Sequence, residues 1–102
     1  MITAEISVVP IGTKTPSVSK YVARAIKALS AQDKLKYQLT AMGTILEGEL
    51  DDVFEVAKKM HQCLFDEEIK RVVTTIRIDD RRDKNATADS KVASVLKKLG
   101  QK

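Results

Sequence analysis

The sequence predicts an α+β fold in which one antiparallel sheet carries its helices on a single face. Three segments, 2–9, 36–42 and 70–81, alternate apolar with polar residues, as half-buried strands do. Segments between and after them repeat apolar residues every three or four positions, which is typical of amphipathic helices. With 102 residues, 43% of them hydrophobic, the chain is long enough for one core only, so we expect a single domain over 1–102.

The first half should hold a strand, a helix and two short strands. Segment 2–9 predicts the first strand, and Thr15 followed by Pro16 predicts the N-cap and first residue of a helix that continues to about residue 31. Segments 36–42 and 44–49 predict two strands that meet at Gly43, either as a hairpin or as a bulged continuation.

The second half repeats a helix and a strand. Asp52, with Glu55 three residues on, is typical of a capping box, and the helix that it starts should end near Phe65. Segment 70–81 is rich in β-branched residues and predicts a long strand. A short terminal helix should then end at Gly100.

The order is therefore βαββαβ with an appended helix, which is typical of a ferredoxin-like sandwich whose second sheet face stays open. Alternation places Tyr37 on the covered face, with Leu39 and Ala41. It places on the open face Glu5, Ser7, Val9, Gln38, Thr40, Met42, Ile45, Glu47, Val73, Thr75 and Arg77. Because a solvated face would not need so many apolar side chains, we expect this face to pack against another subunit.

Composition argues against several function classes. The net charge is +4, but only four aromatic residues are present, so the stacking aromatics of a nucleic-acid-binding sheet are missing. No apolar run approaches the length of a membrane span and no export signal precedes the first strand, so we expect a cytoplasmic protein without membrane contact. Scattered glycines, one cysteine and one histidine predict neither a nucleotide cofactor nor a metal site.

The polar candidates allow more than one interpretation. Glu5, Glu47 and Arg77 should lie close together on the open face, as an interface ion-pair cluster or as an acid–base site. His61 and Cys63 fit structural roles better than catalytic ones. The loops 10–13 and 42–44 each place a glycine beside a threonine, which suits a small polar pocket as well as ordinary turns.

Three motifs in order resemble the small thiamine-binding protein family. They are Pro10-Ile-Gly-Thr13, Met42-Gly-Thr44 followed by Glu47-Gly48, and Ile78-Asp-Asp-Arg81 with Asp83. The resemblance implies a ferredoxin-like dimer or tetramer that binds thiamine or its hydroxymethylpyrimidine part, although many members have no established role. The binding residues that it implies here are Ser7, Thr40, Met42, Gly43, Thr44 and Glu47.

The leading hypothesis is thus a non-enzymatic binding protein that carries, buffers or senses thiamine or a related pyrimidine. A second hypothesis is a structural or regulatory homo-oligomer without this ligand. A third is an enzyme that uses the carboxylates of the open face, since ferredoxin-like domains host many chemistries.

Overall fold

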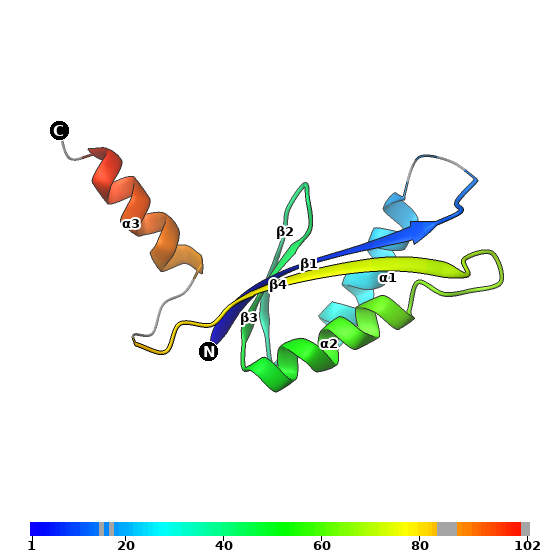
Figure 1. Cartoon of the computed structure of the whole chain (residues 1–102), viewed down its shortest axis with the longest axis horizontal. Helices are drawn as coiled ribbons and strands as arrows, with labels where there is room; N and C mark the ends of the chain where they lie inside the picture. Colours follow the sequence, from blue (N-terminus) through cyan, green and yellow to red (C-terminus); the bar gives the residue numbers. More distant parts are fainter. Residues whose placement is uncertain (15, 17, 84–87, 101–102) are drawn as a thin grey trace.

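The computed structural model describes residues 1–14, 16, 18–83 and 88–100, and its elements follow the predicted order (Figure 1). Its strands are β1 (Ile2–Ile11), β2 (Lys36–Leu39), β3 (Thr44–Gly48) and β4 (Arg71–Asp79). Its helices are α1 (Ser19–Ser30), α2 (Leu50–Gln62) and α3 (Ala88–Gly100). Among these helices none is long and apolar enough to cross a membrane.

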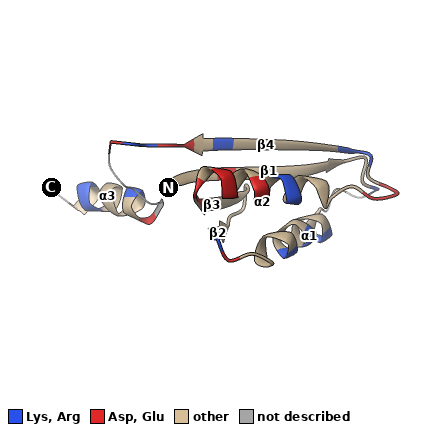
Figure 2. Cartoon of the chain, turned by 90° about the horizontal axis from the view of Figure 1, so that it is seen from below, with Lys and Arg blue, Asp and Glu red and all other residues tan. Residues whose placement is uncertain are grey.

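The strands form one antiparallel sheet in the order β2-β3-β1-β4. Helices α1 and α2 pack against each other on one side of this sheet, and the other side is open (Figure 2). This arrangement confirms the predicted ferredoxin-like α+β fold. In the register, Glu5 of β1 lies opposite Ile45 of β3 and Arg77 of β4.

The core fills the space between the covered sheet face and the two helices. On β1 the buried residues alternate with more exposed ones, and on α1 and α2 they recur at helical spacing. The largest fully buried side chains are Ile6, Leu29, Leu46, Val53, Met60, Leu64 and Ile69. The core is therefore built from side chains of the sheet and of both helices.

Strand β1 is longer than predicted, because it continues through Pro10 to Ile11 where a loop was expected. Strand β3 pairs with β1 only as far as Ile6, whereas β4 pairs with it as far as Ile11. Beyond Ile6, one side of β1 therefore has no pairing partner in β3. Pro10, which has no backbone N–H to donate, is tolerated there because no neighbouring strand needs a hydrogen bond from it.

Both predicted helix starts were wrong by a few residues. Helix α1 begins at Ser19, after Val18, so Pro16 is not its first residue; Thr15 lies outside the described residues. Helix α2 begins at Leu50, so Asp52 lies within its first turn. Its N-cap residue is Glu49, whose side chain makes no capping hydrogen bond. A carboxylate inside the first turn still stabilises the helix, because it offsets the positive end of the helix dipole.

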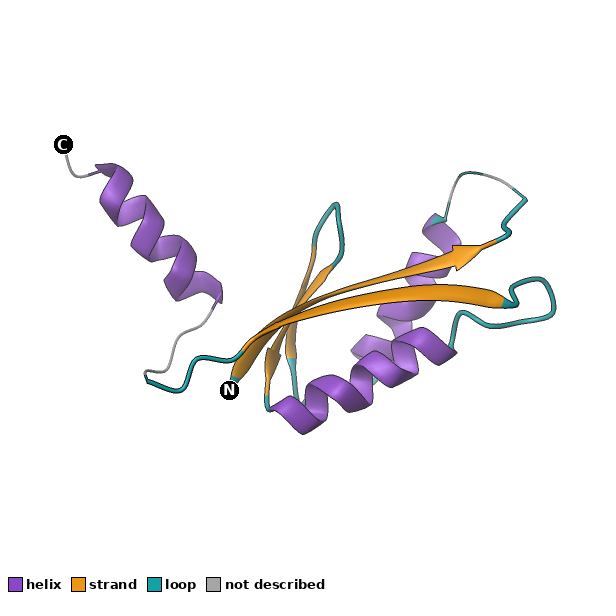
Figure 3. Ribbon diagram, viewed as in Figure 1, coloured by secondary structure: helices purple, strands orange, loops and turns teal. Residues whose placement is uncertain are grey.

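Strand β2 ends at Leu39 and not at residue 42, since residues 40–43 form the turn of a β2–β3 hairpin. Tyr37 and Leu39 are exposed, contrary to their expected place in the core. Strand β2 is one of the two edge strands of the sheet, and the helices pack against its inner strands instead, α1 against β1 and α2 against β1 and β3 (Figure 3).

Helix α3 confirms the predicted terminal helix, although it has 13 residues and stands apart from the sheet and the other helices (Figure 1). Its first turn meets the end of β4, where Lys91 forms an ion pair with Asp79. The large apolar side chains of α3 are 57–68% exposed: Val92, Val95, Leu96 and Leu99.

Candidate functional site

The turn between β2 and β3 is held by hydrogen bonds around Thr40. Its backbone N–H and its hydroxyl both donate to the carbonyl oxygen of Gly43, each at 2.8 Å. The hydroxyl oxygen also accepts a hydrogen bond from the backbone N–H of Met42 at 3.3 Å. Thr40 therefore fixes the shape of this turn.

Gly43 allows the turn to lie directly against β1. A Cβ atom at this position would be only 2.9 Å from the carbonyl oxygen of Ile6. Contacts this close essentially never occur, so a side chain here would displace backbone. The glycine of the Met42-Gly-Thr44 motif is thus required by the approach of two backbones, whatever else it does.

A cavity of about 210 Å³ lies between this turn, the second half of β1 and helix α1. We call it the edge pocket. Five of the six predicted binding residues line it: Ser7, Thr40, Met42, Gly43 and Thr44. Most of the remaining lining is apolar and comes from α1 and β1, so the pocket is less polar than predicted. The loop 10–13, expected to contribute as well, does not line it.

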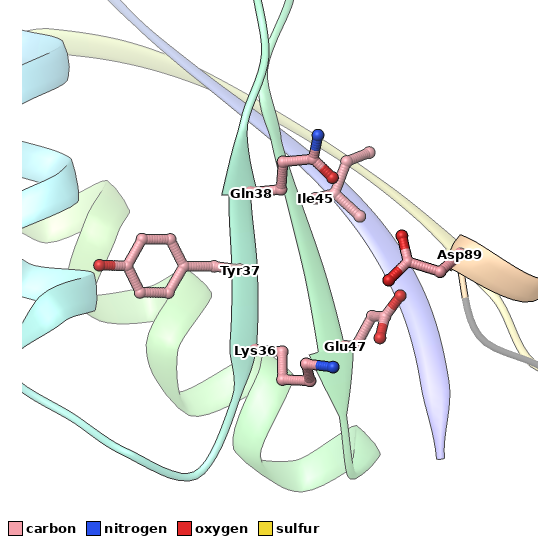
Figure 4. A pocket seen from close by; sticks show the side chains of 6 residues that line it. All are labelled: Lys36, Tyr37, Gln38, Ile45, Glu47 and Asp89. Atoms are coloured by element: carbon pink, nitrogen blue, oxygen red, sulfur yellow. The ribbon is translucent and has the colours of Figure 1, made fainter. Parts of the chain in front are cut away.

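Glu47, the sixth predicted residue, lies elsewhere. Together with Lys36, Gln38, Ile45 and the first turn of α3, it lines a cavity of about 110 Å³, which we call the open-face pocket (Figure 4). Thr44 and Glu47 are three residues apart on one strand, so their side chains point to opposite faces of the sheet. The structure therefore brings five of the six predicted residues to one cavity and places Glu47 in another.

The open-face pocket brings two carboxylates together. Figure 4 shows the side chains of Glu47 and Asp89 directed toward each other, with Lys36 below them, while Tyr37 points to the other side of β2. Glu47 is buried although it carries a carboxylate. No pattern in the sequence predicts that Asp89, from α3, lies here, because its position depends on the path of the chain after β4.

The predicted cluster of Glu5, Glu47 and Arg77 is only partly formed. Arg77 donates a hydrogen bond to Glu5 at 2.8 Å, as an ion pair across β1 and β4. Glu47 lies opposite Thr3 and Lys36, two residues further along the sheet. Glu5 and Glu47 are therefore not paired as acid and base in one site.

His61 and Cys63 both have structural surroundings. The Nδ1 atom of His61 lies 2.6 Å from the hydroxyl oxygen of Thr74, and its ring meets the ring of Phe65 edge-on. The Cys63 thiol donates to the carbonyl oxygen of Met60 at 3.1 Å, and burial raises the pKa of this thiol. A raised pKa lowers the fraction of reactive thiolate, so Cys63 is a poor nucleophile.

The acidic and basic residues after β4 pair with one another, as a solvated bend does. Arg81 donates to Asp83, and Arg82 donates to Asp80 at 2.9 Å. The hydrogen bond from Arg82 lowers the pKa of Asp80. Within residues 1–14, 16, 18–83 and 88–100, no three His, Cys, Asp or Glu side chains gather as metal ligands.

The sequence missed the contribution of α1 to the edge pocket. Val18, Val22, Ala25 and Ile26 line it from the helix side. Their three- and four-residue spacing correctly predicts a face turned toward the sheet. It cannot show that the sheet leaves a gap beneath them, because that gap depends on where β3 begins relative to β1.

Comparison with known proteins decides the family. Residues 4–96 match the profile of the thiamine-binding protein family. This chain belongs to that family. The resemblance seen in the three sequence motifs is thereby confirmed.

Relatives of similar length support this assignment. The UPF0045 protein YqgV of Bacillus subtilis is 52% identical over 102 residues, covering 97% of this chain and 98% of its own. A UPF0045 protein of Methanothermobacter thermautotrophicus is 44% identical, covering 97% of this chain and all of its own. The relatives are thus matched along almost their whole length.

Solved structures agree with the fold. A hypothetical protein of Methanocaldococcus jannaschii superposes with a TM-score of 0.83 at 40% identity, covering 92% of this chain and 94% of its own. A Thermotoga maritima protein described as a candidate for thiamine biosynthesis or salvage gives 0.75 at 26% identity, covering 92% and 97%. Membership of the thiamine-binding protein family supports a general small-molecule-binding role for this chain.

Proposed function

We propose that this protein binds thiamine, or its hydroxymethylpyrimidine part, in the edge pocket, as a cytoplasmic carrier, buffer or sensor that performs no chemistry on it. The observation that carries the proposal is the convergence of Ser7, Thr40, Met42, Gly43 and Thr44 on one cavity. These residues come from β1 and from the β2–β3 turn, and membership of the thiamine-binding protein family supports a ligand of this class.

The character of the edge pocket favours the pyrimidine end of thiamine. The described residues that line it include no charged side chain, so a fixed thiazolium cation would lose its hydration there without a counter-charge from them. An uncharged aminopyrimidine instead offers a flat apolar ring with polar edges. The ring suits the valines and isoleucines of the lining, and a polar edge suits the hydroxyl of Thr44.

The size of the edge pocket leads to the same conclusion. Pockets for drug-sized ligands usually measure about 300–1,000 Å³, whereas this cavity holds about 210 Å³. One aromatic ring with its substituents suits such a volume better than the whole of thiamine. The thiazolium ring would then lie at the rim of the pocket, where Met42 is 82% exposed and offers a polarizable thioether.

The lining also supports binding without catalysis. Ser7, Thr40 and Thr44 are hydroxyl residues, and among the residues placed by the structure no imidazole, amine or carboxylate lines the edge pocket to activate a hydroxyl. Glu47 and Asp89 supply carboxylates in the open-face pocket, which shares no described lining residue with the edge pocket.

Isothermal titration with thiamine and with hydroxymethylpyrimidine tests the proposal. The protein is first unfolded and refolded to remove any bound ligand. We expect saturable binding of both compounds. Thr44→Val should weaken it by roughly tenfold, because it removes one buried hydrogen bond of about 1–1.5 kcal/mol at nearly constant volume. Thr3→Val, at the other end of β1 and outside both pockets, is the matched control and should bind as the wild type does.

Glu47→Gln distinguishes the two pockets. Unchanged affinity in this variant, with weakened binding in Thr44→Val, supports the edge pocket. Weakened binding in Glu47→Gln with unchanged Thr44→Val would move the ligand to the open-face pocket. If neither compound binds, by titration or by thermal shift, the thiamine proposal is wrong.

We further propose that the chain forms a homo-oligomer through its open sheet face. Val9 and Val73 lie opposite each other on this face and are 42% and 45% exposed. The ion pair of Glu5 with Arg77 lies on the same face and could order such an interface. Light scattering should give a mass of at least twice 11.3 kDa at micromolar concentration, and a monomer would refute this part of the proposal.

The alternative is a structural or regulatory homo-oligomer that does not bind this ligand. In that case Glu5→Ala or Arg77→Ala should dissociate the oligomer, and neither thiamine nor hydroxymethylpyrimidine should bind. Measuring mass and ligand binding on the same variants separates the two functions.

A further inference from the structure

Helix α3 carries an apolar face that its own chain leaves uncovered. Val92, Val95, Leu96 and Leu99 recur at helical spacing, and all are more than half exposed. The opposite side of the helix holds Ser94 and Lys97. An amphipathic helix of this kind gains stability mainly from packing its apolar face on something, and this one stands apart from the body of the protein (Figures 1 and 3).

The first turn of α3 directs the helix away from its own sheet. Lys91 forms an ion pair with Asp79 at the end of β4, and Asp89 forms one wall of the open-face pocket beside Glu47 (Figure 4). From this anchored turn the helix extends outward, beyond the N-terminal end of β1 (Figure 1). In this arrangement the valines and leucines of α3 cannot cover the open face of the same chain.

We propose that the apolar face of α3 packs on the open sheet face of a second copy of this chain. The inference rests on the proposed self-association through that face and specifies what covers it. The partner surface contains Val9 and Val73, which lie side by side on β1 and β4, and the half-buried Ile45 of β3. The open face also carries the Glu5–Arg77 ion pair, but its two valines and the apolar side chains of α3 are all at least 42% exposed within one chain.

The dimensions of the two surfaces agree. A helix of 13 residues is about 20 Å long, and a four-stranded sheet has nearly the same width, since neighbouring strands lie about 4.8 Å apart. The exposed apolar area of the four α3 side chains is on the order of 300–400 Å². Two reciprocal contacts would bury roughly 1,200–1,600 Å² in total, which is the size of a standard stable interface.

The proposal links assembly to the open-face pocket. Asp89 lies in the first turn of α3, so a helix held by a second copy also holds this wall of the pocket in place. The edge pocket has no residue from α3. Of the proposed partner surface, Val9 also lines the edge pocket and Val73 and Ile45 do not. Changes in α3 should therefore alter the assembly much more than ligand binding in the edge pocket.

Light scattering on the full chain gives the first test. Leu96→Asp places a carboxylate on the apolar face of α3, whereas Ser94→Asp places the same charge on its polar side. We expect Leu96→Asp to lower the mass at least twofold and Ser94→Asp to keep the mass of the wild type. If the wild type is monomeric, both self-association and this inference fail. If the wild type is oligomeric and Leu96→Asp keeps its mass, only the role of α3 fails.

Cross-linking between two distinguishable copies gives the second test. In a Cys63→Ser background, a tagged chain with Val95→Cys is co-expressed with an untagged chain carrying Val73→Cys, and a short bismaleimide is added. A tagged–untagged product supports the packing of α3 on the sheet of another copy. Ser94→Cys in place of Val95→Cys is the control and should give little product. Only Val73–Val73 or only Val95–Val95 products would overturn the proposal, as would the absence of any product.

Discussion

The close approach of the β2–β3 turn to β1 can be tested by adding a single methyl group at Gly43. In Gly43→Ala the new Cβ atom would lie 2.9 Å from the carbonyl oxygen of Ile6, where ordinary contacts begin at 3.4 Å. Ile6 pairs with both β3 and β4, so its backbone cannot move without disturbing two ladders. The turn, and not the strand, must therefore give way.

The cost of Gly43→Ala follows from this geometry. Overpacking of this kind destabilises a protein by about 1–3 kcal/mol. Alanine recovers roughly 0.4–1 kcal/mol, because it reduces the conformational freedom of the unfolded chain. A net loss of about 1–2 kcal/mol should lower Tm by roughly 5–15 °C in a domain of this size.

Thermal unfolding followed by circular dichroism measures this effect. All samples must have the same protein concentration, since self-association makes Tm depend on concentration. Gly100→Ala is the matched control, because a Cβ atom there meets nothing within 4 Å. If Gly43→Ala and Gly100→Ala melt at the same temperature, the turn does not lie against β1 as described.

Three further predictions concern polar groups outside the pockets. The backbone N–H of Ile69 donates a hydrogen bond to Asp66 and lowers the pKa of this carboxyl below 3.8 in the folded protein. Ionised Asp66 therefore stabilises the fold fully above pH 3.8, and this stabilisation is lost as the pH falls through the lower folded-state pKa. Asp66→Asn should therefore flatten the acid side of the stability curve in urea titrations from about pH 6 to about pH 3. Because burial raises the pKa of the Cys63 thiol, the native protein should react with a disulfide reagent several times more slowly than the unfolded chain, and equal rates would contradict this. Thr74→Val removes the hydrogen bond to His61 and should cost about 1 kcal/mol in urea unfolding, whereas Thr75→Val, which faces the other way, should cost less.

The sequence predicted the fold because the signals were periodic and mutually consistent. Alternation on β1, as at Ile2, Ala4 and Ile6, correctly marked the covered face, and the helical stripes marked the faces that meet it. Element ends were predicted less well. A proline inside β1 is tolerated only because β3 stops pairing at Ile6, and no local pattern contains that information.

The candidate site was predicted in part for a similar reason. The Met42-Gly-Thr44 motif is contiguous, so its residues necessarily meet, and Ser7 lies beside them because it directly follows Ile6, which pairs with Thr44. Glu47 follows on the same strand, but strand alternation turns it to the opposite face. Asp89 joins Glu47 only through the path of the chain after β4, which depends on three-dimensional structure alone.

The edge pocket lies at the turn of the β2–β3 hairpin and the open-face pocket lies further along its strands, and the two share no described residue. This separates most of the ligand site from the part of the chain that α3 anchors. The edge pocket is lined by β1, the β2–β3 turn and the helices of the covered face, so its shape depends on the core of a single chain. The open-face pocket depends on α3, which has no cover within that chain. Thr44→Val should therefore alter affinity at constant mass, and Leu96→Asp should alter mass at constant affinity. If either substitution changed both properties, the edge pocket would have to extend to the subunit interface, and the ligand would then be bound between copies and not within one.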